Sequence, residues 1–291
     1  MQFIYKIPGY ILILIGAFFL SWGGLLIREI ENADIWQILF WRAFFFSLTL
    51  VFFLFFKHKK KALYSIKKSG HPGIAYGFAM SLGFVAYIVA MTETTVANVL
   101  FIISSQTIWL AIFGYFFLKE KISLKTLFSI FLAMVGITVM IGGSLDAGSL
   151  KGNLVALYIP INFAFLILLI RKFPKIDFVP PLLIAGFLSM LYGFVISETI
   201  LISLHDLLIV FLLGSIQHAF GFICITIGAR STPAVIVGLL MLTEALFGPF
   251  WVWLFINEIP PTSVFLGGSI IAIAVILKTL EQKHSKNSKS I

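Results

Sequence analysis

The amino-acid sequence predicts an all-α integral membrane protein with ten transmembrane helices. Apolar side chains make up 60% of the 291 residues, and the mean hydropathy is +1.07. Charged residues account for 11%, against about 25% in a typical soluble domain. A helix needs about 20 residues to cross a bilayer, so ten helices leave no room for a large soluble domain. The single cysteine, Cys224, excludes an internal disulfide and a cysteine-based metal cluster.

Ten apolar segments, each bounded by charged residues or by Pro, Gly or Asn, are long enough to span the membrane. Helices satisfy their own backbone hydrogen bonds in lipid, so we expect no strands. The first segment follows Lys6 as a signal peptide would, but its length favours a retained helix. The segments lie near residues 9–28, 35–56, 73–91, 97–118, 125–143, 152–170, 179–198, 207–229, 234–256 and 263–280.

The distribution of basic residues predicts that both termini are cytoplasmic, because Lys and Arg in short loops are retained on that side. With the N-terminus inside, only Arg28 and Lys151 of the 21 basic residues fall in outer segments, and Arg42 falls within a span. The net charge of +9 therefore reports topology in the inner or plasma membrane, and we expect no nucleic-acid partner. The basic loop over residues 57–68 could also contact anionic lipid headgroups.

An internal repeat divides the chain into two halves. Residues 94–120 align without a gap on residues 232–258, with Gln106 on Glu244 and Glu120 on Glu258. Five helices per half is an odd number, so the second half must enter the membrane inverted, as in many secondary transporters. We expect one five-helix repeat over residues 1–147, a second over 148–282, and a basic cytoplasmic tail over 283–291.

Short motifs resemble the EamA-like transporters of the drug/metabolite transporter superfamily over about residues 9–280. The resemblance implies two inverted five-helix halves around a central cavity, which moves small metabolites by alternating access. The family usually has proline where this chain has Thr107 and Ala245, and glycine where it has Lys119 and Asn257. The motifs are Trp22 and Gly23, Arg42, Thr94 to Ala97, Leu118 to Glu120, and Ile256 to Glu258.

Two formal charges remain inside predicted spans, Arg42 and Glu244, and charges at membrane depth are usually functional. Glu244 lies near the midpoint of its segment, where a carboxyl group suits the loading and unloading of a proton. The alternative is a protonated or paired carboxyl group that only holds helices together. Arg42 could neutralise a substrate carboxylate, pair with Glu244, or reach the interface beside Glu31 or Asp34.

Prolines within two segments predict freed backbone carbonyls at membrane depth. Pro249 removes the hydrogen bond to the carbonyl of Ala245, next to Glu244, and Pro160 removes the bond to Ala156, near Asn162. A polar cavity or a neighbouring hydroxyl could satisfy each carbonyl. Asn162 is therefore a candidate site residue.

Gln106 and Glu244 are each followed by aromatic residues three and seven positions on, which places each set on one helix face. Trp109 and Phe113 follow Gln106, and Phe247 and Trp251 follow Glu244. Such walls could hold an aromatic or cationic solute. Chance is the alternative, because the chain has 32 Phe, 8 Tyr and 6 Trp.

His218, beside Gln217 in the eighth segment, suits either a proton relay or an interhelical hydrogen bond. Trp22, one of the residues that carry the resemblance, completes the candidate site.

These features predict a secondary-active transporter of a small metabolite such as an amino acid or a related amphipathic solute, and the resemblance to EamA-like transporters implies export. The alternatives are a proton-coupled importer of an organic cation or metabolite, and a passive channel. No Gly-x-x-x-x-Gly-Lys loop or His-Glu-x-x-His motif is present, so we expect no ATPase, enzyme activity, metal or cofactor. Expected partners are the solute, the bilayer and protons, and a homodimer is left open.

Overall fold

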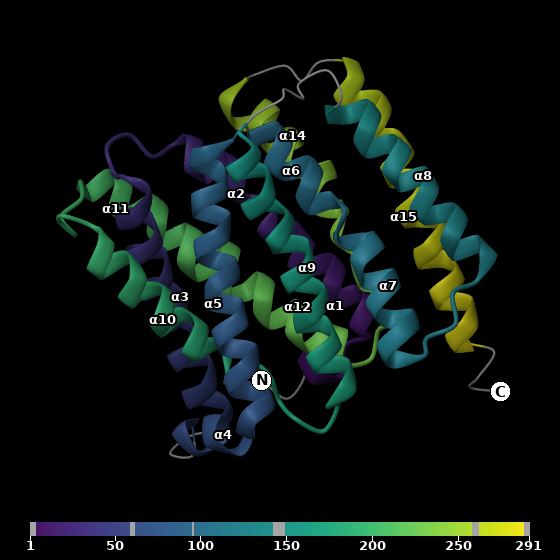
Figure 1. Cartoon of the computed structure of the whole chain (residues 1–291), viewed down its shortest axis with the longest axis horizontal. Helices are drawn as coiled ribbons and strands as arrows, with labels where there is room; N and C mark the ends of the chain where they lie inside the picture. The colour runs from purple at the N-terminus through teal and green to yellow at the C-terminus, as the bar shows by residue number, and fades with distance from the viewer. Residues whose placement is uncertain (1–3, 59–61, 95, 142–148, 258–261, 288–291) are drawn as a thin grey trace.

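The computed structural model describes the chain except for residues 1–3, 59–61, 95, 142–148, 258–261 and 288–291 (Figure 1). Within these limits the protein is helical and contains no strand, as predicted. A short 3-10 helix, η1 (Ile4–Lys6), precedes the first half of the bundle. That half consists of α1 (Gly9–Leu20), α2 (Gly23–Arg28), α3 (Ile35–His58), α4 (Ala62–Lys68), α5 (Gly70–Glu93), α6 (Val96–Ser104), α7 (Gln106–Leu118) and α8 (Leu124–Ile141).

The second half begins with the long helix α9. The second half also contains a π-helix, η4, in which each turn is wider than in an α-helix. The elements are α9 (Leu150–Lys172), α10 (Leu182–Ile196), α11 (Leu204–Phe211), η4 (Leu212–Phe220), α12 (Gly221–Ala229), α13 (Ala234–Met241), α14 (Thr243–Ile256) and α15 (Thr262–Asn287).

Seven helical segments among the described residues are long and apolar enough to cross a membrane. Three shorter apolar helices, at 124–140, 182–196 and 262–277, coincide with the remaining predicted segments. The predicted segment 179–198 becomes helix only from Leu182, because Pro180 and Pro181 precede it and proline favours the first turn of a helix. The protein is thus a multi-pass membrane protein, and the crossing of all ten helices stays a prediction.

The aligned part of the repeat has the same helix limits in both halves. The helix pair α6–α7 begins at Val96 and ends at Leu118, and the pair α13–α14 begins at Ala234 and ends at Ile256. Each pair is followed by a left-handed residue, Lys119 with φ of 55° and Asn257 with φ of 58°. Glycine adopts this conformation without strain, which is a physical reason for the glycine that related transporters usually carry there.

The packing of helices also relates the two halves. Helix α1 packs on α12 and α5 packs on α9, so the first and third predicted spans of one half contact the third and first of the other. The pairs α3–α10 and α8–α15 join equivalent helices directly (Figure 1). Such reciprocal contacts, in which each half contributes the same two spans, are expected when a two-fold axis relates the halves. The predicted boundary between them, at residues 147–148, lies outside the described part of the chain and stays a prediction.

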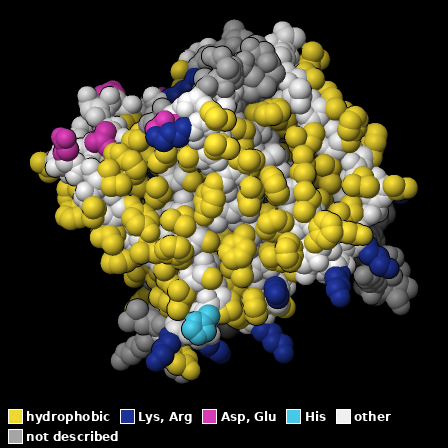
Figure 2. Space-filling view, viewed as in Figure 1, with side chains coloured by type: hydrophobic (Ala, Val, Ile, Leu, Met, Phe, Trp, Pro, Cys, Tyr) yellow, Lys and Arg dark blue, Asp and Glu magenta, His cyan; other side chains and the backbone are white. Residues whose placement is uncertain are grey.

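Charged side chains gather at the two ends of the bundle, with a hydrophobic belt between them (Figure 2). Large exposed hydrophobic residues such as Phe52, Phe116 and Phe131 make up this belt. Helix α4 and the start of α1 lie at one edge in Figure 1. We call this edge the basic end, and it carries Lys57, Lys119, Arg171 and Arg230. We call the opposite edge the acidic end, and it carries Glu29, Asp34, Glu93 and Asp206.

Candidate functional site

Arg42 lies in the middle of α3 with 5% of its surface exposed. Its guanidinium group lies 5.8 Å from the centre of the Phe84 ring on α5, within the range of a cation–π contact. The guanidinium makes no hydrogen bond or ion pair with any residue that the structure describes. A buried cation without a counterion is costly, so this position suits an anionic group that arrives from outside the protein.

His218 lies in η4, next to Arg42, and is almost fully buried. Its ring is surrounded by Phe46, Phe84 and Phe222 at centroid distances of 5.3, 4.4 and 4.8 Å. Neither ring nitrogen has a hydrogen-bond partner among the described residues. The close approach of η4 to α3 depends on Gly214, because a Cβ atom there would lie 2.5 Å from the carbonyl oxygen of Arg42.

Glu244 is the second residue of α14, directly after the break at Leu242, and it is half-buried. It therefore lies near the middle of the helix pair α13–α14, where the sequence places it. Tyr87 of α5 lies close enough to both Glu244 and Arg42 for the charge of each to act at its hydroxyl group. Gln106, the repeat partner of Glu244, begins α7 directly after the equivalent break and is 6% exposed.

Trp22 and Trp251 belong to an aromatic cluster at the break between α1 and α2. Their ring centroids are 5.6 Å apart, and Phe18 packs edge-on against Trp251 at 5.4 Å. The Nε1 of Trp251 donates a hydrogen bond of 2.8 Å to the hydroxyl of Ser21, whereas the buried Nε1 of Trp22 has no partner in the described part of the chain. Phe247 stacks on Trp251, with a centroid distance of 6.1 Å, so one predicted aromatic wall is present.

The side chain of Gln217 forms a hydrogen bond with a backbone carbonyl group at the end of α1. Its Nε2 donates a hydrogen bond of 3.0 Å to the carbonyl of Leu20, and its Oε1 is buried without a described partner. The hydroxyl group of Thr243 likewise has no partner among the described residues. Thr243 lies beside an open apolar groove of about 530 Å³ between α1 and α14, lined by Leu14, Ile15, Phe18, Phe19, Thr243 and Phe247.

The second predicted wall, on α7, has a different environment. Trp109 is half-buried and packs on the main hydrophobic core, and it forms no ring pair with described residues. Phe113 pairs with Phe117 of its own helix at 5.4 Å. The symmetric sequence pattern therefore does not give two matching aromatic walls, because the residues that face α7 differ from those that face α14.

Asn162 joins two helices. Its Nδ2 donates a hydrogen bond of 2.9 Å to the carbonyl of Ala79 on α5. Gly83 lies one turn further along α5, and a Cβ atom there would lie 2.6 Å from the same nitrogen. Helix α9 continues through Pro160, and α14 continues through Pro249. A binding role for Asn162 stays a prediction, and its described contact is an interhelical hydrogen bond.

Phe84 and Tyr87 were not identified from the sequence. They are three residues apart and so lie on one face of α5, towards Arg42 and His218. The same spacing is common among the many aromatic residues of this chain. Only the packing of α5 against α3 and η4 distinguishes these two rings from the others.

Comparison with known proteins shows what this chain is similar to. Residues 7–142 match the family model of the EamA-like transporters. A relative from Clostridium kluyveri, described as an uncharacterized transporter, is 24% identical over 234 residues, which are 73% of this chain and 72% of that protein. These matches confirm the predicted resemblance. The first half of the chain is thus similar to the EamA-like transporters of the drug/metabolite transporter superfamily, and both matches support a membrane transporter.

One solved structure, whose title reads "Crystal structure of protein", superposes with a TM-score of 0.78. The superposition covers 94% of this chain and 97% of the other, at 13% sequence identity. At this identity the likeness establishes a shared fold alone. It shows that the whole described bundle, and not only the first half, follows a known arrangement.

Proposed function

We propose that this protein is a secondary-active transporter that exports a small amphipathic metabolite, such as an amino acid, by alternating access. Ten helices in two inverted halves cross the cytoplasmic membrane, with both termini and the basic end in the cytoplasm. The observation that carries the proposal is a pair of buried polar side chains. The ring nitrogens of His218 have no described partner, and the guanidinium of Arg42 has only the aromatic contact with Phe84 among described residues. Such groups are stable only if water or a solute completes their interactions.

The charges suit a solute that carries both signs. Arg42 lies on α3 and Glu244 on α14, and Tyr87 of α5 lies near both charges. A zwitterion could place its carboxylate on Arg42 and its ammonium group near Glu244, so that each buried charge gains a partner. The rings of Phe84 and Tyr87 would then contact the apolar part of the solute.

The helix packing supports a state that is closed at the basic end. Helices α7 and α13, which lead to that end, pack against each other, and both also pack on α9. The other members of the two pairs have separate neighbours, with α6 on α8 and α9, and α14 on α1, α2 and α15. The breaks at Ser105 and Leu242 allow each pair to move as two units, as broken helices do in other secondary transporters.

A second candidate is a proton-coupled importer of an organic cation. The aromatic cluster of Trp22, Phe247 and Trp251 favours it, because ring faces near a carboxyl group such as Glu244 attract cations. A passive channel is the third candidate. The packing of α7 against α13 at the basic end disfavours a channel, because a channel needs a continuous open path.

Counterflow into liposomes tests the proposal. The purified full chain is reconstituted, loaded with an unlabelled solute, and supplied with the labelled solute outside, with and without a pH gradient. We expect transient accumulation of a zwitterionic amino acid and none of an inorganic ion. Accumulation of an organic cation alone would favour the importer, and flux without counterflow would favour the channel.

A further inference from the structure

Glu120 connects three helices at the basic end. It follows the left-handed residue Lys119, which turns the chain at the end of α7. One carboxylate oxygen, Oε2, accepts a hydrogen bond of 2.8 Å from the backbone N–H of Ala234, the first residue of α13. The other, Oε1, accepts bonds of 3.1 and 2.9 Å from Nε and Nη2 of Arg171, at the end of α9. A single carboxylate therefore holds α7, α9 and α13 together.

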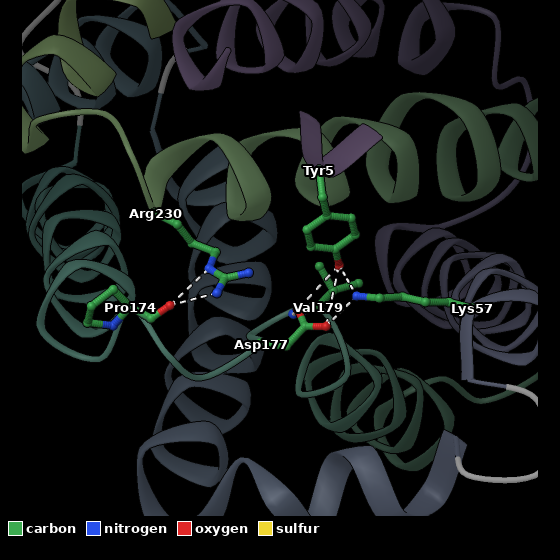
Figure 3. Close-up of polar contacts among 6 residues, drawn as sticks. All are labelled: Tyr5, Lys57, Pro174, Asp177, Val179 and Arg230. Carbon is green, nitrogen blue, oxygen red and sulfur yellow. Dashed lines mark hydrogen bonds and ion pairs between the residues drawn. The ribbon is translucent and has the colours of Figure 1, made fainter. Parts of the chain in front are cut away.

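The partners of Glu120 extend this network. Arg171 also donates from Nη1 to the carbonyl of Arg230, at 3.1 Å, and so reaches the turn that precedes α13. The guanidinium of Arg230 donates to the carbonyl of Pro174, at 2.6 and 3.2 Å (Figure 3). The side chains of Glu120 and Arg171 are 13% and 24% exposed, so water screens their ion pair less than it screens a surface pair.

A second cluster at the same end does not include α13. The ammonium group of Lys57 lies 2.5 Å from the carboxylate of Asp177 and contacts the hydroxyl of Tyr5, which donates to Asp177 at 3.3 Å (Figure 3). Burial, together with the charge of Asp177, raises the pKa of Tyr5, so its hydroxyl keeps the proton that it donates. This cluster ties the N-terminus and α3 to the loop that follows α9.

The contact between α7 and α13 is close because small residues face it. A Cβ atom on Gly238 would lie 2.8 Å from the Cα of Thr107 and 3.0 Å from the side chain of Leu110. A Cβ atom on Gly114 would lie 3.1 Å from Oε2 of Glu120 and 3.4 Å from Ala234. Packing of this kind is lost in full once the helices separate, so the closed contact and the bonds of Glu120 form and break together.

We propose that Glu120 is the latch that keeps the basic end closed during the transport cycle. Opening this end requires α13 to leave α7, which removes the Ala234 N–H from the carboxylate and exposes the Glu120–Arg171 pair. The closed state is favoured because the carboxylate lies at the N-terminus of α13, where the backbone N–H groups have no partner within the helix. The inference rests on the proposed alternating access, and Glu120 acts here as a positioning residue, not as a ligand of the solute.

Cysteine accessibility tests the latch without a substrate. Leu110 is fully buried at the contact with α13, so L110C reacts with a membrane-impermeant maleimide only when this contact opens. The natural thiol is removed first by C224A. We expect E120Q to increase the rate of labelling from the basic end about tenfold, the size of a typical coupling between conformational states. R171Q should act in the same direction.

The matched control is E93Q at the acidic end. Glu93 accepts a bond of 2.6 Å from Lys151 in an exposed ion pair that does not involve α7 or α13. E93Q should leave the labelling rate within about twofold of the parent. An E120Q protein that labels at the parent rate, with R171Q also unchanged, would overturn the latch.

The experiment distinguishes a folding defect from a failure of the latch, and a failure of the latch from a failure of the proposed function. If E120Q does not fold, R171Q decides the question, and thermal melting of each variant separates a loss of stability from a shift in opening. A parent protein that shows counterflow while E120Q labels normally would retain the proposed function and remove the latch. The reverse result, no counterflow for any solute but faster labelling of E120Q, would retain the latch and remove the function.

Discussion

The middle and the basic end of this bundle differ in whether their buried polar side chains have hydrogen-bond partners. At the basic end, Glu120, Arg171 and Arg230 form hydrogen bonds with one another or with backbone groups of several segments. In the middle, Arg42 and His218 are more deeply buried, and neither forms a hydrogen bond or ion pair within the described chain. The deeper groups would cost more if left unpaired.

On the two proposals above, this difference separates groups that close the protein from groups that bind a solute. A partnered network lowers the free energy of one packing of the helices, so its loss should change conformation or stability. An unpartnered group contributes nothing comparable to the empty protein, so its loss should change solute binding. The predictions below test this division, beginning with the largest expected effect.

Replacing Arg42 by Gln should have the largest effect. Loss of the guanidinium removes the buried partner of a substrate carboxylate, so kcat/KM for carboxylate solutes should fall about 100-fold, or about 3 kcal/mol. Solutes without a carboxylate should lose much less. Counterflow rates for matched pairs of solutes measure the effect.

The control for this variant is Lys172→Gln, which removes a basic residue from the exposed end of α9. It should change neither class of solute. Equal losses for carboxylates and cations in Arg42→Gln would show that Arg42 holds helices together, and the contrast between middle and basic end would then not apply to it.

Replacing Glu244 by Gln should abolish transport that is driven by a pH gradient and preserve counterflow. The amide keeps the shape of the side chain but cannot exchange a proton at the middle of the membrane. We expect at least a tenfold loss of gradient-driven flux, about the size of an ordinary coupling free energy. Glu198→Gln, at an exposed position of the acidic end, is the matched control. Undiminished pH-driven transport in Glu244→Gln would remove this residue from the mechanism.

The sequence predicted much of the fold because the membrane imposes simple rules on it. Apolar length and loop charge predicted the helical segments, and the alignment of residues 94–120 on 232–258 predicted two equivalent spans, which have the same limits and the same left-handed ends. The breaks within these spans, at Ser105 and Leu242, were not predicted. The hydroxyl of Ser105 donates a hydrogen bond of 2.6 Å to the carbonyl of Ile102 and so competes with the helix hydrogen bonds there. Leu242 has no such side chain, so packing decides where α13 ends.

The candidate site was predicted in part. Arg42, Glu244 and His218 are titratable side chains within apolar segments, and this rule alone identifies them. It cannot say which uncharged neighbours complete the site, and so Phe84 and Tyr87 were missed. Conversely, the symmetric aromatic spacing on α7 and α14 predicted two walls, but Trp109 packs on the core and only the α14 side forms a cluster. Side-chain spacing fixes a helix face, but the neighbouring helices decide what that face contacts.

Replacing Asn162 by Ala should destabilise the protein moderately. Asn162 is buried but partnered, so the contrast drawn above assigns it to helix packing and not to the solute. Loss of its hydrogen bond to Ala79 should lower the free energy of unfolding by about 1 kcal/mol, within the range of interhelical hydrogen bonds in membranes. Thermal melting in detergent measures the change. A raised KM with an unchanged melting temperature of Asn162→Ala would instead support a solute-binding role for Asn162.

The smallest effect should come from Lys151→Ala at the acidic end. Lys151 and Glu93 are 2.6 Å apart, closer than Glu120 and Arg171 at 2.9 Å, but their side chains are 71% and 34% exposed. Water and salt screen such a pair, and ordering two long side chains costs entropy, so we expect a change below about 0.5 kcal/mol in stability. Melting curves at low and high ionic strength should nearly superpose for this variant and the parent. A loss as large as that of Asn162→Ala would mean that exposure does not decide which ion pairs of this bundle matter, and the latch assigned to Glu120 would lose its physical basis.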